Sequence, residues 1–174
     1  NWMPLVADHC IDYPPEFYVN WGVKRLHDKE CFQPTDIENI KENDIILDIG
    51  GNDGSQLEQY KKLGFKELIN FESATNICTL SEEKGLKTIN NFFNEENVKE
   101  KLEPNSVKLI NASGVFFHLE ELDSVIKGIN YCLKDDGVFV AQCMYVGAMV
   151  DNLNFDTIYH EHLCYYTLNS LTKL

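Results

Sequence analysis

The residues best suited to moving protons lie late in the chain, within residues 154–166. There the run Tyr159-His160-Glu161-His162 places histidine, glutamate and tyrosine together, and all three types can transfer protons near neutral pH when their surroundings tune them. In an extended segment the side chains alternate, so His160 and His162 would share one side and Tyr159 and Glu161 the other. The sequence leaves open which pair faces a pocket.

Histidines also have plainer roles, and the residues alone do not exclude them. The pair His160 and His162 has no third placed ligand, which is a weak pattern for zinc, so we expect no metal. His118 follows an apolar run and is predicted to open a helix. That position is more typical of a packed or capping histidine than of a catalyst.

A second chemical signal lies early in the chain, in a glycine-rich turn. The segment Asp48-Ile49-Gly50-Gly51-Asn52-Asp53-Gly54 has the form D-x-G-x-x-x-G, and glycine there lets backbone approach a ligand closely. The spacing G-x-G-x-x-G of a dinucleotide site fails, because Asn52 and Ser55 stand where its second and third glycines belong. Glu72 ends the next predicted strand and can accept hydrogen bonds from two ribose hydroxyls. The pattern indicates a ribose without a pyrophosphate.

These residues need a scaffold, and the chain alternates strand-like and helix-like runs. Strands are expected at 44–49, 67–71, 86–90, 107–111 and 138–144, and helices at 56–62 (capped by Ser55), 74–84, 95–102 and 120–133. Asp135-Asp136-Gly137 is expected to turn the chain into the last strand. Such alternation predicts an α/β fold, a doubly wound parallel sheet with helices on both faces. Every motif above then falls at the carboxyl end of a strand, where ligands bind in such sheets.

Composition narrows the function classes. The 174 residues carry a net charge of −13 and are 44% hydrophobic, with Arg25 as the only arginine and scattered lysines. A basic surface for nucleic acid is therefore not expected. The longest apolar stretches are about ten residues, against the roughly twenty needed to cross a bilayer. The six cysteines form no C-x-x-C pair, so we expect reduced thiols and a cytoplasmic protein.

The chain divides into two unequal parts. Residues 1–33 are punctuated by prolines and rich in aromatic rings (Trp2, Tyr13, Phe17, Tyr18 and Trp21). They are predicted to form an N-terminal arm or lid packed on the domain formed by residues 34–174.

The glycine turn, Glu72 one strand later and Asn111 closing the fourth strand together resemble the class I S-adenosylmethionine methyltransferases. The resemblance implies S-adenosylmethionine as the cofactor. It assigns the glycine turn to the methionine end, Glu72 to the ribose, and Asn91 with Phe92 to the adenine. The turn residues concerned are Asp48, Gly50, Asn52 and Gly54.

The late segment narrows the resemblance further. The run D-T-I-Y-H-E-H at 156–162 resembles the nucleotide-sugar C-methyltransferases, and the similarity extends back through the motifs above to about residue 45. It implies that His162 is the general base and that Glu161, Tyr159 and His118 assist around the sugar.

That chemistry suits these residue types. Methylating carbon requires a carbon nucleophile, which a 4-keto sugar supplies once the proton beside its carbonyl is removed. His162 would take this proton, Tyr159 or His118 would donate a hydrogen bond to the enolate oxygen, and Glu161 would orient its neighbours.

The chain also departs from that family. It has no paired C-x-x-C motifs of an N-terminal zinc module, and the two strands that normally complete the sheet are expected to be missing, since 168–174 only begins the preceding helix. The open edge would then be covered by residues 1–33 or by another subunit in an oligomer. Two alternatives stay open: O- or N-methylation of another small molecule, and a cofactor-binding assembly subunit without catalysis.

Overall fold

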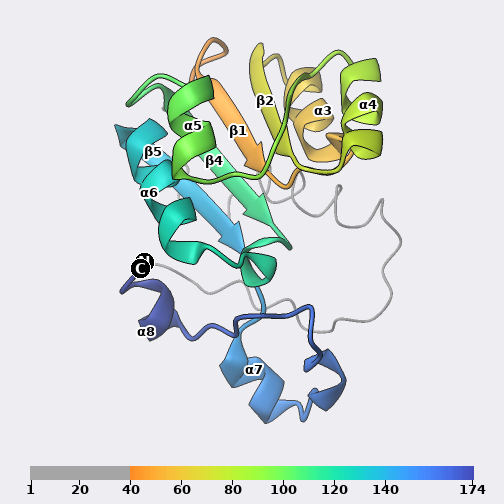
Figure 1. Cartoon of the computed structure of the whole chain (residues 1–174), viewed down its shortest axis with the longest axis vertical. Helices are drawn as coiled ribbons and strands as arrows, with labels where there is room; N and C mark the ends of the chain where they lie inside the picture. The colour runs from red at the N-terminus through yellow and green to blue at the C-terminus, as the bar shows by residue number, and fades with distance from the viewer. Residues whose placement is uncertain (1–39) are drawn as a thin grey trace.

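The computed structural model describes residues 40–174, and these contain one five-stranded sheet (Figure 1). The strands are β1 (Ile45–Ile49), β2 (Glu67–Glu72), β3 (Lys87–Asn90), β4 (Val107–Ser113) and β5 (Leu133–Gln142). Their order is β3-β2-β1-β4-β5, and every neighbouring pair is parallel. The chain thus winds outward from β1 in one direction and then crosses back to β4, which creates a switch point between β1 and β4.

Helices cover both faces of this sheet (Figure 1). α3 (Ser55–Lys62) and α4 (Thr75–Glu83) lie on one face, and α5 (Glu95–Lys101) and α6 (Leu122–Cys132) on the other. A smaller core joins Ile46, Leu68 and Leu109 of the sheet to α3, and a larger one joins the opposite sheet face to α5 and α6. The expected fold class is confirmed.

Alternation along the strands explains how polar residues enter this interior. In β1 the side chains of Leu47 and Ile49 belong to the larger core, so Ile46 and Asp48 face α3. Asp48 is in register with Asn70 of β2 and with Asn111 of β4. Three polar side chains therefore form one row across the sheet, just before the strands end.

The C-terminal segment packs beyond the carboxyl edge of the sheet (Figure 1). It contains α7 (Val146–Asp151), the 3-10 helix η2 (Phe155–Thr157) and α8 (Leu168–Leu171), and the 3-10 helix η1 (Phe116–His118) follows β4. The Tyr166 hydroxyl donates a hydrogen bond to the Phe116 carbonyl at 3.1 Å, and Leu163 N–H donates to Phe117 O at 2.9 Å. These contacts attach the late segment to the end of β4.

Two expected boundaries differ from the structure near the sheet. Ser55 is the first residue of α3 rather than its cap, because Gly54 in a left-handed conformation (φ 74°) takes the capping position. β4 continues two residues past Asn111, to Ser113.

The expected turn at Asp135-Asp136-Gly137 lies inside β5 instead of before it. Val107 pairs with Leu133 but Leu109 pairs with Val138, so this part of β5 bulges out of register. The buried Lys108 ammonium accounts for this bulge, because it lies 2.6 Å from the Asp136 carbonyl oxygen and 2.9 Å from the Asp136 carboxylate.

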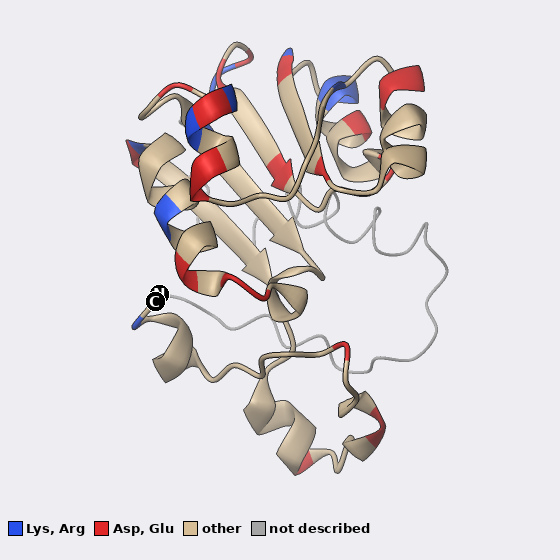
Figure 2. Ribbon diagram, in the orientation of Figure 1, with Lys and Arg blue, Asp and Glu red and all other residues tan. Residues whose placement is uncertain are grey.

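Charged residues of both signs interleave on the outer helices (Figure 2). Three ion pairs with i,i+4 spacing lie on α3, α5 and α6: Glu58–Lys62, Glu95–Lys99 and Asp123–Lys127. Among residues 40–174, no helix combines the length and the apolar character needed to cross a membrane. The predicted arm at 1–33 lies outside the described residues and stays a prediction.

Candidate functional site

The glycine turn between β1 and α3 alternates left-handed residues. Gly50, Asn52 and Gly54 have φ values of 61°, 51° and 74°. Asparagine visits this region more readily than other residues with a side chain, so Asn52 takes a position that would otherwise favour glycine. A Cβ on Gly50 would lie 2.8 Å from Cγ2 of Val115. The bare backbone therefore permits the close approach of the turn to the loop after β4.

Glu72 lies beside this turn at the end of β2. Its Oε2 accepts a hydrogen bond from Asn52 N–H at 3.0 Å, and its Oε1 accepts one from Ala74 N–H at 2.8 Å. Since a carboxylate offers about four lone pairs, each oxygen keeps one for a further donor. The half-buried group can therefore also receive ribose hydroxyls.

Asn91 and Phe92 follow β3 and differ in what they offer. The Asn91 amide donates to Asn97 Oδ1 and its Oδ1 accepts from Phe92 N–H, both at 2.9 Å. Asn91 thus shapes the loop, whereas the Phe92 ring is 72% exposed. Of the two residues assigned to the adenine, Phe92 has the more exposed side chain.

Asp48 and Asn111 belong to the polar row across the sheet, and each is only 2% exposed. Asn111 Nδ2 donates to the Tyr60 hydroxyl at 3.2 Å. Within residues 40–174, Asp48 Oδ1 has no hydrogen-bond partner. Burial and the nearby charge of Glu72 raise the pKa of Asp48 to about 8. Asp48 lies against the turn, since a Cβ on Gly51 would lie 2.9 Å from its Oδ2, whereas Asn111 contacts α3 through Tyr60.

The late segment forms a turn and is not extended, so the expected alternation is wrong. His162 N–H donates to Tyr159 O at 3.0 Å. The Tyr159 and His162 rings consequently stack with centroids 4.0 Å apart. The His160 side chain is 90% exposed and its Nε2 lies 3.4 Å from Glu161 Oε1. His162 therefore pairs with Tyr159, and His160 and the Glu161 carboxylate lie together elsewhere.

His118 joins this cluster from the end of β4. It ends the 3-10 helix η1 rather than opening a helix, and its ring centroid lies 5.0 Å from that of His162. The Phe117 ring contacts both, at centroid distances of 4.4 and 4.6 Å. Residues more than forty positions apart in the chain thus form one aromatic cluster at the carboxyl edge of the sheet.

The hydrogen bonds of the two histidines define their tautomers. His118 Nδ1 lies 2.7 Å from Glu161 O, and His162 Nδ1 lies 2.9 Å from Thr157 O. A carbonyl oxygen only accepts, so each Nδ1 must carry the hydrogen. In the neutral ring Nε2 is then the nitrogen with the free lone pair.

Three residues of this region were missed by sequence reasoning: Asn70, Phe117 and Thr157. Asn70 had a signal, because an amide in the otherwise apolar run of β2 must find partners when buried. Thr157 contributes its backbone carbonyl to His162, and Phe117 contributes a ring that contacts both histidines. Residue type does not predict either contact.

A family model described as a methyltransferase domain matches residues 26–174. The chain belongs to the methyltransferase domain family. Its similarity to the curated C-methyltransferase NovU of Streptomyces niveus is 28% identity over 136 residues, which cover 78% of this chain. They cover 32% of NovU, so this methyltransferase domain spans about a third of that relative.

Solved structures show the same fold. A SAM-dependent methyltransferase from Archaeoglobus fulgidus matches with a TM-score of 0.66 at 20% identity, covering 80% of this chain and 62% of that one. One from Thermotoga maritima matches with a TM-score of 0.62 at 13% identity, covering 90% and 70%. At these identities the likeness establishes architecture only.

S-adenosylmethionine is the cofactor of methyltransferase domains with this fold, and the site fits it. The turn presents backbone without side chains at Gly50 and Gly54, Glu72 has lone pairs for ribose hydroxyls, and Phe92 offers an apolar ring to a base. All of them lie at the carboxyl ends of β1, β2 and β3. This donor set suits a nucleoside with a polar tail.

Proposed function

We propose that this protein catalyses S-adenosylmethionine-dependent methylation of carbon in a small carbonyl compound, such as a nucleotide-linked keto sugar, through an enolate. The observation that carries the proposal is the contact of His162 with Tyr159 and His118, in which Nδ1 of each histidine bonds to a carbonyl and Nε2 has no hydrogen-bond partner among residues 40–174. The 28% identity to C-methyltransferase NovU supports the same reaction class.

The cofactor supplies an electrophilic methyl group when bound. We assign its ribose to Glu72, its adenine to Phe92 and its methionine end to the glycine turn, with Asp48 lying against the turn and Asn111 bonded to α3. Because these groups lie on three neighbouring strand ends, they would hold an elongated ligand along the sheet edge.

His162 is assigned as the base that removes the proton beside the substrate carbonyl. Its Nε2 has the free lone pair, and its Nδ1–H bond to Thr157 O holds the ring in place. That same bond strengthens when the ring becomes cationic, since a charged donor makes a stronger hydrogen bond. The fixed tautomer therefore suits proton abstraction.

Tyr159 is assigned as the donor to the enolate oxygen. Its ring lies against His162, and its hydroxyl can donate. Neutral His118 has committed its hydrogen to Glu161 O, so its Nε2 can accept from a substrate hydroxyl but cannot donate. Glu161 assists through its backbone carbonyl, which orients His118.

The deciding experiment compares His162→Asn with His160→Asn as the matched control, because His160 is exposed and outside the cluster. With a nucleotide-linked 4-keto sugar in D₂O, we expect His162→Asn to lose turnover and α-proton exchange by about a thousandfold. Affinity for S-adenosylhomocysteine should change less than about twofold. Full turnover in His162→Asn would contradict the assignment.

A second candidate is a cofactor-binding subunit of an assembly. It is favoured by exposed apolar side chains around the late segment, namely Val150, Leu153, Phe155, Ile158 and Leu163. If the wild-type chain binds S-adenosylhomocysteine but exchanges no α-proton and methylates no carbonyl, oxygen or nitrogen acceptor, this second function is supported over catalysis.

A further inference from the structure

Asn70 is a fully buried polar residue beside the glycine turn, with 0% of its surface exposed. It lies in the middle of β2 among apolar neighbours. Its Nδ2 donates to the Asn52 carbonyl at 2.8 Å and to Ser81 Oγ at 3.0 Å. A buried amide costs stability unless such bonds form, so its two donors are committed to the turn and to α4.

The backbone of Asn52 is thereby held on both sides of its Cα. Its carbonyl accepts from Asn70, and its N–H donates to Glu72 Oε2 at 3.0 Å. Asn70 and Glu72 are two positions apart on β2, which places both side chains on the same face. The restraint holds Asn52 in a left-handed conformation (φ 51°), which is less favourable for a residue with a Cβ than for glycine.

The two restraints differ in their relation to the cofactor. Glu72 faces the proposed ribose position, where it would accept from ligand hydroxyls as well as from Asn52 N–H. Asn70 lies entirely inside the protein, and its bond to Asn52 O does not compete with ligand. We propose that Asn70 is a positioning residue for S-adenosylmethionine, because its bond to the Asn52 carbonyl fixes the backbone of the turn in the geometry that receives the cofactor.

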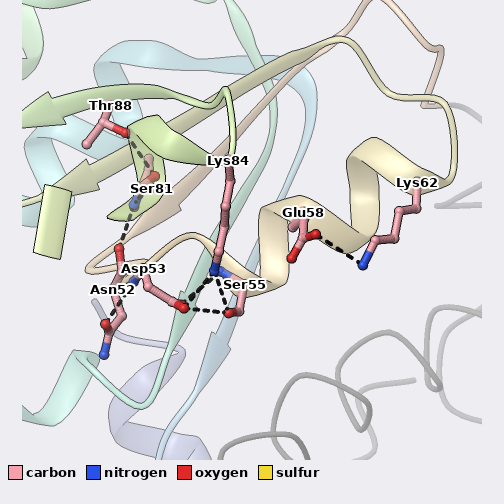
Figure 3. A network of polar contacts seen from close by, with 9 residues as sticks. Asn52, Asp53, Ser55, Glu58, Lys62, Ser81, Lys84 and Thr88 are labelled. Atoms are coloured by element: carbon pink, nitrogen blue, oxygen red, sulfur yellow. Dashed lines mark hydrogen bonds and ion pairs between the residues drawn. The ribbon is translucent and has the colours of Figure 1, made fainter. Parts of the chain in front are cut away.

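Surrounding contacts make the amide rigid. Ser81 Oγ also accepts from Thr88 Oγ1 at 2.9 Å. On the other side of the turn, Lys84 Nζ lies 2.6 Å from Asp53 Oδ2 (Figure 3). A Cβ on Gly51 would lie 2.4 Å from Asn70 Oδ1. The turn is packed against the amide, so a small displacement of Asn70 must displace the turn.

The test compares Asn70→Ala with Ser81→Ala in the full chain. Both variants lose one bond between Asn70 and Ser81, but only Asn70→Ala loses the bond to the Asn52 carbonyl. S-adenosylhomocysteine affinity is measured by calorimetry and stability by thermal unfolding. We expect Asn70→Ala to weaken affinity about tenfold, and Ser81→Ala to lower the melting temperature with an affinity change below about twofold.

A double-mutant cycle isolates the turn itself. Asn52→Gly makes the turn more flexible, and its effect on affinity should be at least about three times larger in the Asn70→Ala background than in the wild type. Amide hydrogen exchange of residues 50–54 should accelerate in Asn70→Ala without ligand. This readout does not depend on turnover.

Unchanged affinity in a folded Asn70→Ala protein would overturn the proposal, as would an equal loss in Ser81→Ala or equal effects of Asn52→Gly in both backgrounds. If Asn70→Ala does not fold, Asn70→Ser takes its place with the same criteria. Because calorimetry and hydrogen exchange need no methyl acceptor, failure here is distinguishable from failure of the C-methylation proposal.

Discussion

The proposed cofactor side and the proposed acceptor side of the site are held in different ways. Around the glycine turn, polar side chains from β2, the end of α4 and the turn itself form hydrogen bonds, of which those of Asn70 and Lys84 are partly or fully buried. Around His162, tilted ring contacts and bonds to backbone carbonyls hold groups that stay partly exposed, and Tyr159 is 46% exposed. The first arrangement suits a constant ligand and the second suits a substrate that must enter and leave.

This contrast predicts that changes on the acceptor side affect turnover while leaving cofactor affinity intact. Tyr159→Phe removes the proposed donor to the enolate oxygen and keeps the ring against His162. We expect turnover to fall about a hundredfold. The measurement is kcat with a nucleotide-linked 4-keto sugar, alongside calorimetry with S-adenosylhomocysteine.

The control for that variant is Tyr131→Phe, since Tyr131 belongs to α6 outside the site. If Tyr159→Phe weakens cofactor affinity by the same factor as it lowers turnover, the two sides of the site are not separate in function.

The next effect concerns stability and Asp48. Since its folded pKa is raised to about 8 from the ordinary value of 3.8, the native state holds a proton that the unfolded chain releases between those two values. The free energy of unfolding should therefore fall as pH rises from about 4 to 8. Asp48→Asn mimics the protonated acid and should remove this slope.

We expect Asp48→Asn to be about 2 kcal/mol more stable than the wild type near pH 8, with the difference vanishing near pH 4. Urea unfolding at several pH values measures it. A variant that is less stable at every pH would mean that the Asp48 charge, not its proton, supports the buried polar row across the sheet.

Glu72→Gln tests the cofactor side directly. The amide keeps one acceptor oxygen but loses the charge and turns a donor toward either Asn52 N–H or Ala74 N–H. We expect S-adenosylhomocysteine affinity to fall about tenfold, with kcat at saturating cofactor changed less than about twofold. Glu58→Gln on the exposed side of α3 is the control, and a larger effect on kcat than on affinity would contradict the prediction.

The smallest effect is expected at the surface ion pair beside the turn. Partial burial works against ionisation of Asp53, but hydrogen bonds from Lys84 and Ser55 outweigh it and lower its pKa. Both partners are partly exposed, so Lys84→Met should cost only about 0.5 kcal/mol. The cost should shrink in high salt and as pH falls through the lowered pKa of Asp53. If Lys84→Met lowers the free energy of unfolding as much as Asn70→Ala does, the ion pair would support the turn as strongly as the buried amide.

Much of the scaffold was predictable because local pattern and global fold agree. Short apolar runs ending in glycine or acidic residues marked β1 and β2, and the expected helices match α4, α5 and α6 to within two residues at each end. The bulge in β5 was not predictable, because it depends on Lys108 of β4 reaching Asp136 across the sheet.

The sequence predicted where the candidate residues lie in the fold, and their roles stay predictions. Asp48 and Glu72 lie at the carboxyl ends of β1 and β2, and His118 and His162 lie in segments that follow β4 and β5. The pairing of His162 with Tyr159 was missed because a turn replaces the extended segment. Asn70 was missed because its partners lie 18 and 11 positions away in the chain.

The sequence by itself determined the parallel α/β sheet, the glycine turn and the acidic residue after β2, since periodicity and glycine placement act over a few neighbouring residues. Only the tertiary structure decided which nitrogen of each histidine is free, which ring His162 contacts and that a buried amide holds the turn. Those properties depend on carbonyls and side chains brought together from distant segments, and hydrogen bonds form only at the short distances that folding creates.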